Sequence, residues 1–148
     1  MRNKRITAVA IILIMLALIL TGCRVREKYE LLHQEDEVSS VEIVTVLFDE
    51  EGIADLQVKA YVSNVKAFMK DFRAVPCYVY FGDPIGLKEN PSGIDVIRIT
   101  YQNRDYELID YNGQSEYTQE RGFNYYAGFS VFDEDEFKEL IGKYVDRQ

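Results

Sequence analysis

The spacing of apolar positions changes several times along the chain, and each spacing predicts a different element. Residues 41–48, rich in Val, Ile, Leu and Thr, predict a first strand that ends in a turn at Asp49–Gly52. From Asp55 to Arg73, apolar side chains recur at steps of three and four residues, with lysines on the other side. This periodicity predicts a long amphipathic helix that buries one face against a sheet.

The second half of the chain predicts antiparallel strands joined by short turns. Pro76 ends the helical segment, and residues 77–81 predict a strand. A two-residue turn at Asn103-Arg104 would pair Tyr101 with Tyr106. That register would give the hairpin one apolar face, made of Ile97, Ile99, Tyr101, Tyr106 and Leu108. Asn112-Gly113 is a strong signal for the next hairpin, and residues 123–132 predict the last strand.

A second helix is predicted at the C-terminus from its local signals. Asp133 is the expected N-cap, Glu136 is its capping-box partner, and Phe132 and Phe137 are placed for a hydrophobic staple. The order strand, helix, several strands, helix predicts the α+β class. We expect an antiparallel sheet of about five or six strands, with the long helix and a short C-terminal helix packed on it.

Residues 1–22 have the composition of an export signal. Met1–Arg5 is basic, Ile6–Leu20 is apolar, and the small residue Gly22 precedes Cys23. The run Leu20-Thr21-Gly22-Cys23 resembles the lipobox of bacterial lipoproteins. The resemblance implies that the Cys23 thiol carries a diacylglycerol and that Gly22 is the last residue removed. It also implies that the lipoprotein signal peptidase recognises Leu20, Thr21 and Gly22.

By this interpretation, the chain divides into a signal peptide at 1–22, a lipid-anchored tether at 23–40 and a single α+β domain at 41–148. The lipid on Cys23 would hold the domain on the extracytoplasmic face of the cell membrane. If extended, the tether would reach about 55 Å. Two alternatives stay open. One is an ordinary signal peptide cleaved without lipidation; the other is an uncleaved anchor, for which the 18 residues of 6–23 are barely long enough.

The charge balance of the chain restricts the classes of partner that it can bind. The chain has 17 Lys and Arg against 25 Asp and Glu. Residues 1–22 contain three of the basic residues and none of the acidic ones, so the remainder has a formal charge near −11. An acidic domain of this kind lacks the basic surface that nucleic-acid phosphates require, so we expect no nucleic-acid partner.

The inventory of chemically reactive residues is short. His33 lies in the predicted tether, where no rigid strand is expected to hold it as a catalytic base. Cys77 sits in an apolar run and is expected to be buried. No metal site and no cofactor are expected, since a zinc site needs several His or Cys ligands and no Gly-rich phosphate loop is present. Carboxylate pairs stay possible among the many acids, with Asp83, Asp110 and Glu116 near turns.

Tyrosine is the remaining unusual feature, with 11 in the chain. Tyrosine favours strands, but it is also enriched at binding interfaces. The expected binding surface consists of Tyr111, Tyr117, Tyr125 and Tyr126. The leading hypothesis is therefore a non-enzymatic lipoprotein that binds a protein or an envelope component. The alternatives are a wall-glycan-directed enzyme with paired carboxylates and a passive structural lipoprotein.

A second resemblance covers the part after residue 41. This part is similar to small uncharacterised lipoproteins of Gram-positive bacteria in three segments: Tyr80-Phe81-Gly82-Asp83-Pro84, Tyr106-Glu107-Leu108-Ile109 and Phe137-Lys138-Glu139-Leu140-Ile141. The resemblance carries no known site.

Overall fold

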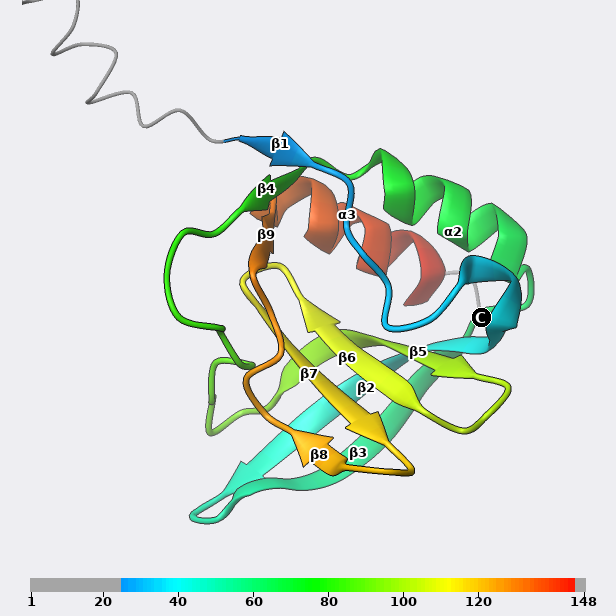
Figure 1. Ribbon diagram of the computed structural model, residues 1–148. Helices are drawn as coiled ribbons and strands as arrows, with labels where there is room; N and C mark the ends of the chain where they lie inside the picture. Colours follow the sequence, from blue (N-terminus) through cyan, green and yellow to red (C-terminus); the bar gives the residue numbers. More distant parts are fainter. Residues whose placement is uncertain (1–24, 146–148) are drawn as a thin grey trace, which may run out of the picture.

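The computed structural model describes residues 25–145, which form two antiparallel sheets and two α-helices (Figure 1). The six-stranded sheet has the order β3-β2-β5-β6-β7-β8, and the three-stranded sheet has the order β1-β4-β9. The strands are β1 (Arg26–Glu27), β2 (Val38–Asp49), β3 (Gly52–Tyr61), β4 (Cys77–Val79), β5 (Ile94–Tyr101), β6 (Tyr106–Asp110), β7 (Gly113–Thr118), β8 (Gly122–Asn124) and β9 (Ser130–Phe132). The helices are the 3₁₀ turn η1 (Glu35–Glu37), α2 (Val65–Ala74) and α3 (Glu134–Val145). The predicted mixture of helices and antiparallel strands is confirmed.

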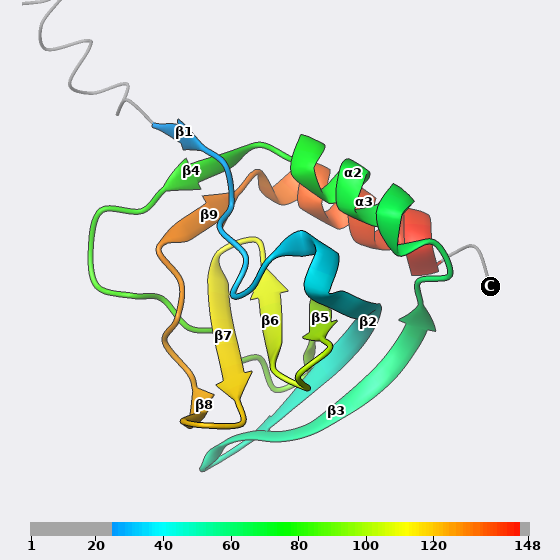
Figure 2. The same ribbon diagram turned by 45° about the vertical axis from the view of Figure 1, so that its right-hand side comes forward.

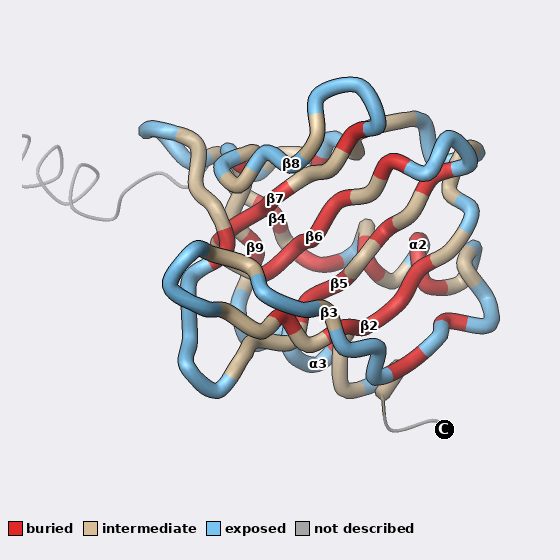
Figure 3. The backbone as a smooth tube through the Cα atoms, turned by 90° about the horizontal axis from the view of Figure 1, so that it is seen from below, coloured by how far each residue is buried: buried red, intermediate tan, exposed pale blue. Residues whose placement is uncertain are grey.

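The six-stranded sheet is strongly curled (Figure 2), and the view onto its face shows buried residues along its central strands (Figure 3). Two register shifts between β2 and β3 leave an extra residue on β3 each time, near Ala54 and near Lys59. Such bulges bend a strand and increase its twist. Helices α2 and α3 and the small sheet lie together over one face of the curled sheet (Figure 2). The domain therefore has two layers, and its main core lies between them.

The main core joins both layers through large apolar side chains. Its fully buried members include Phe68 and Phe72 from α2, Phe137 from α3, and Ile43 and Ile97 from the sheet. A second, smaller cluster lies on the other face of the sheet, with Val44, Val46, Val96 and Leu108 covered by Leu87. Both faces of β2 and β5 are thus buried, which explains why these strands are rich in Val and Ile.

The predicted long helix at 55–73 is wrong, because its first part is strand β3 and only Val65–Ala74 is helical. Residues 55–60 alternate polar and apolar side chains, which is the period of a strand. Their apolar positions also lie three or four residues from those of the following helix, so a strand period and a helix period fit the same stretch. Asn64 separates the elements, because its side chain accepts a hydrogen bond from Ala67 N at 2.9 Å and caps α2.

The predicted register of the β5–β6 hairpin is wrong by one residue. Thr100 pairs with Tyr106 and Ile99 with Glu107. The loop has three residues rather than two, because Arg104 adopts the left-handed conformation with φ 72°. Since one residue of slip exchanges the faces of a strand, Glu107 lies on the apolar face where Tyr106 and Leu108 were expected.

Local signals around the later turns are largely confirmed. The Asn112-Gly113 region joins β6 to β7, with Asp110 opposite Gly113. Asp133 caps α3, because its carboxylate accepts a hydrogen bond from Glu136 N at 3.1 Å. The rings of Phe132 and Phe137 lie 5.2 Å apart as a hydrophobic staple. The predicted last strand at 123–132 is instead divided into β8 and β9, separated by an irregular segment.

The predicted tether is the largest correction, because residues 25–37 pack on the domain. The Tyr29 ring is buried in the main core, 5.6 Å from the ring of Phe72. The Arg73 side chain from α2 donates to Tyr29 O and to the Glu35 carboxylate. Residues 1–24, with the predicted signal and Cys23, lie outside the described residues. The folded unit therefore begins by residue 26 rather than at residue 41.

We predict that Tyr29→Phe lowers the free energy of unfolding by about 1–3 kcal/mol, because it removes a buried hydrogen bond to the Glu107 carboxyl. The Tyr29 hydroxyl donates to Glu107 Oε2 at 2.6 Å. Urea unfolding at neutral pH measures the change. Tyr61→Phe is the matched control, because the Tyr61 ring on β3 is 68% exposed. Equal stability of the Tyr29→Phe variant and the wild type would contradict this role.

Candidate functional site

An aromatic groove lies between the β2–β3 turn and the segment that follows β8. It encloses about 760 Å³. Its aromatic lining comes from Tyr106 on β6, Phe123 on β8, and Tyr125 and Tyr126 beyond β8. Tyr126 is 62% exposed and Phe123 is 42% exposed. We call this surface, together with the turn residues opposite, the aromatic groove.

The rings of the groove are held by contacts with their neighbours. Tyr125 contacts Tyr126 edge-on at 4.9 Å, and the rings of Tyr106 and Tyr117 stack at 5.1 Å. The Tyr125 hydroxyl donates to Leu87 O at 2.5 Å, so this ring also fixes the loop before β5. Burial, followed by the negative charge of Glu89, raises the pKa of Tyr125. Tyr125 therefore supports the groove, and Tyr126 presents an open ring.

The opposite wall of the groove is acidic. Glu50 and Glu51 form the two-residue turn between β2 and β3, and Asp55 and Glu89 also line the groove. None of the described residues that line it is basic. Aromatic faces beside carboxylates attract cations, since the ring faces carry partial negative charge and the carboxylates carry full negative charge. The arrangement is suited to a partner that combines positive charge with apolar groups.

The four tyrosines of the expected binding surface are only partly brought together. Tyr125 and Tyr126 line the groove, and Tyr117 lies behind it through its stacking on Tyr106. Tyr111 lies elsewhere, beside α3, where Lys138 Nζ sits 5.3 Å from its ring centre. The expected lipidation and signal-peptidase residues, Cys23, Leu20, Thr21 and Gly22, lie outside the described residues.

Phe123 and the acids of the β2–β3 turn were missed as members of the site. The sequence pattern predicts only a strand at Phe123 and only a turn at Glu50 and Glu51. Sequence separation hid the relation, because the groove joins positions near 51 with positions near 126. The curl of the sheet brings them together, and that curl depends on bulges for which the sequence shows no clear signal.

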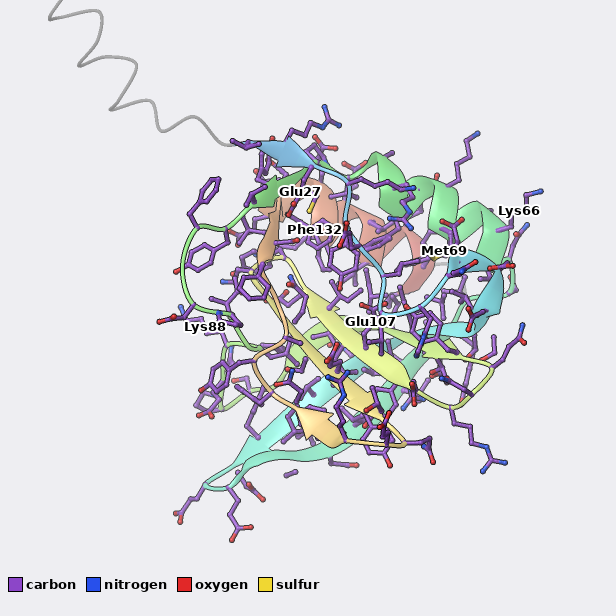
Figure 4. The ribbon with its side chains drawn as sticks, in the orientation of Figure 1. Glu27, Lys66, Met69, Lys88, Glu107 and Phe132 are labelled. Carbon is purple, nitrogen blue, oxygen red and sulfur yellow. The ribbon has the colours of Figure 1, made fainter. Side chains whose placement is uncertain are left out.

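A second cavity, of about 310 Å³, lies under the N-terminal segment and contains two carboxyls on adjacent strands. Glu107 on β6 pairs with Glu116 on β7. Burial raises the pKa of Glu107, although hydrogen bonds from Tyr101, Tyr29 and Leu32 N lower it in part. Figure 4 labels Glu107 between the N-terminal segment and β6. Its two carboxyl oxygens accept from two hydroxyls and one backbone N–H.

A third cavity, of about 570 Å³, lies between α3 and the loop before β5, and Asp110 is its buried carboxyl. Burial raises the pKa of Asp110 to about 6, against the opposing effects of Tyr111 N–H and Lys138. The candidate acids Asp83, Asp110 and Glu116 are not brought together. Glu116 lies in the second cavity and Asp83 is on an exposed loop.

His33 is held firmly, contrary to the expectation from the sequence. Its Nε2 lies 2.7 Å from Asp105 Oδ2, and Asn103 Nδ2 lies 3.2 Å from the same nitrogen. Burial alone would raise the pKa of Asp105, but hydrogen bonds from Gln119 N, His33 and Asn103 lower it overall. The pair fastens the N-terminal segment to the β5–β6 loop. Its hydrogen-bond partners Asp105 and Asn103 are not nucleophiles of the Ser or Cys type.

The other features considered from the sequence are Cys77, a metal site and a membrane-spanning helix. Cys77 is buried in β4, and burial raises the pKa of its thiol to about 11. Within residues 25–145, no group of three His, Cys, Asp or Glu side chains is arranged to hold a metal ion. No helix in this part of the chain has the length and apolar character needed to cross a bilayer.

Comparison with family models, with curated proteins and with solved structures gives no match for this chain.

We predict that Asp110→Asn changes how stability depends on pH. Because the folded-state pKa of about 6 is raised, the stabilising effect of protonated Asp110 is complete below about pH 4 and is lost as pH rises through 6. The asparagine variant should therefore gain about 2 kcal/mol relative to the wild type between pH 4 and 7. Urea unfolding at both pH values measures this gain. Asp83→Asn is the control for charge removal, and an equal gain there would contradict the prediction.

Proposed function

We propose that the protein is a lipid-anchored binding protein of the extracytoplasmic face of the cell membrane, and that its aromatic groove holds a cationic partner segment. The observation that carries the proposal is the groove itself, with Phe123 and Tyr126 open to solvent. Exposed aromatic rings are costly to leave in water and are enriched at protein interfaces.

The groove chemistry favours a protein segment with Lys or Arg beside apolar residues. Guanidinium and ammonium groups bind to ring faces and to carboxylates at the same time. Tyr126 supplies a ring, and Glu50 and Glu51 supply charge from the opposite wall. The net negative charge of the chain would also increase the rate of encounter with such a partner.

The proposed location is supported by the N-terminal pattern. A basic start, an apolar stretch and Leu20-Thr21-Gly22-Cys23 together fit export and lipidation. A diacylglycerol supplies two acyl chains, which are sufficient for stable membrane attachment.

A hydrolase of wall glycans is the second candidate function, and the Glu107–Glu116 pair is the observation in its favour. Two adjacent carboxyls, one with a raised pKa, are the arrangement that glycosidases require. The contacts of Glu107 argue against it. Both of its oxygens are occupied by donors that hold the fold together, so Glu107 has a structural role.

We predict that Cys23→Ala prevents lipidation and leaves a longer, unprocessed precursor. The thiol is the group that accepts the diacylglycerol, so no other residue of the lipobox can replace it. Metabolic labelling with a radioactive fatty acid, followed by mass spectrometry, measures the change. Cys77→Ala is the matched control, because Cys77 is buried in β4. Continued labelling of the Cys23→Ala protein would contradict the proposed anchor.

We predict that a photo-crosslinking amino acid at position 126 captures a partner in intact membranes, and that the same group at position 61 does not. Both positions carry exposed tyrosines, but only Tyr126 lies in the groove. Adding Phe123→Ala should reduce the adduct at least about threefold, since hot-spot aromatics each contribute more than 1 kcal/mol to binding.

The adduct should also decrease at high salt, because the proposed recognition depends on charge. Tyr125→Ala is a poor test, because the Tyr125 hydroxyl supports the loop through Leu87. Equal adducts from positions 126 and 61, or an adduct at 126 that Phe123→Ala leaves unchanged, would exclude the groove as the binding surface.

A further inference from the structure

Four exposed apolar residues lie at the end of the small sheet where the chain enters the domain. Val25 precedes β1, Tyr80 and Phe81 follow β4, and Phe129 precedes β9. Phe81 is 77% exposed and Phe129 is 52% exposed. We call these four residues the anchor-side patch. It is separate from the aromatic groove, whose exposed rings are Phe123 and Tyr126.

Backbone hydrogen bonds hold the anchor-side patch together. Val79 N donates to Val25 O at 2.9 Å, and Tyr80 N donates to Phe129 O at 2.7 Å. Because β4 lies between β1 and β9, three distant segments of the chain meet at this end of the small sheet (Figure 1). The patch is therefore built on a paired framework rather than on a free end.

The position of Cys23 in the sequence sets how close the proposed lipid lies to the patch. Cys23 precedes Val25 by two residues. Consecutive Cα atoms are 3.8 Å apart, so the Cα atoms of Cys23 and Val25 are separated by at most about 7 Å. A lipid on Cys23 would therefore hold Val25, and the paired strands beside it, at the level of the headgroups.

We propose that the anchor-side patch is a membrane-contact surface, which inserts its aromatic rings into the interfacial layer of the bilayer. This inference rests on the proposed lipidation of Cys23. Aromatic side chains favour the boundary between headgroups and acyl chains. The exposed Arg26 and Lys28 lie on the adjoining stretch of chain and attract anionic headgroups.

Charge elsewhere on the domain restricts membrane contact to this end. The part of the chain from Cys23 onward has a formal charge near −11, so most of its surface is repelled by anionic lipid. Glu27 lies at the patch as well, but its carboxylate accepts a hydrogen bond from the Ser130 hydroxyl at 2.7 Å. The patch combines exposed rings with nearby basic residues, and the bilayer is the surface to which the anchor brings it.

The chain contains no tryptophan, so a single introduced tryptophan reports on one position. The test compares Phe81→Trp with the matched control Phe123→Trp, another exposed phenylalanine that lies in the aromatic groove. Each lipidated protein, processed at Cys23, is reconstituted into phosphatidylcholine vesicles, with and without phosphatidylglycerol. The acyl chains carry bromine, which quenches tryptophan fluorescence at short range. Mass spectrometry first establishes the acylation of Cys23.

The expected result is a blue-shifted emission from position 81 that brominated lipid quenches about twofold or more, with little quenching at position 123. Equal and weak quenching at both positions, in protein with an acylated Cys23, overturns the membrane-contact surface and leaves the anchor intact. Absence of the acyl group overturns both proposals. The emission of Trp at position 81 is also recorded in native membranes. If it is blue-shifted there but not in vesicles, a protein covers the patch, and the lipid assignment is wrong.

Discussion

The burial of the Glu107 carboxyl is the constraint on which the rest of the fold depends. A carboxyl on an apolar sheet face is costly unless donors satisfy it. Tyr101 supplies one donor from within the sheet, but Tyr29 and Leu32 supply the others from the N-terminal segment. The segment cannot leave the sheet without exposing or orphaning this group. The N-terminal segment, residues 25–37, contains no α-helix and carries several charges, yet these hydrogen bonds make it part of the core.

Local signals in the sequence predicted local structure well, and long-range placement poorly. The Asp133 cap and the Asn112-Gly113 hairpin depend on neighbouring residues, so they could be identified from sequence alone. The β5–β6 register could not, because it depends on one left-handed residue, Arg104, which the sequence does not mark. That single step exchanged the faces of β6 and hid the buried carboxyl. The aromatic character of the site was visible in the sequence, whereas its acidic wall was not.

The two polar clusters of the domain differ in how much of their surface they leave in water. Around Glu107, the hydroxyls of Tyr29 and Tyr101 donate to the carboxyl inside the protein and attach the N-terminal segment to the sheet. In the aromatic groove, the rings of Phe123 and Tyr126 and the acids of the β2–β3 turn keep much of their surface in water. The proposed binding surface is therefore the groove, whose groups are open to solvent, rather than the buried carboxyl with the raised pKa.

The shortness of the link between Cys23 and β1 has a geometric consequence. The β2–β3 turn lies at the far end of the domain from β1 (Figures 1 and 2). With the proposed attachment at Cys23, the groove beside this turn would lie on the part of the domain away from the lipid. A partner confined within the bilayer would find it out of reach. The proposed anchor would thus favour partners that reach the groove from outside the membrane.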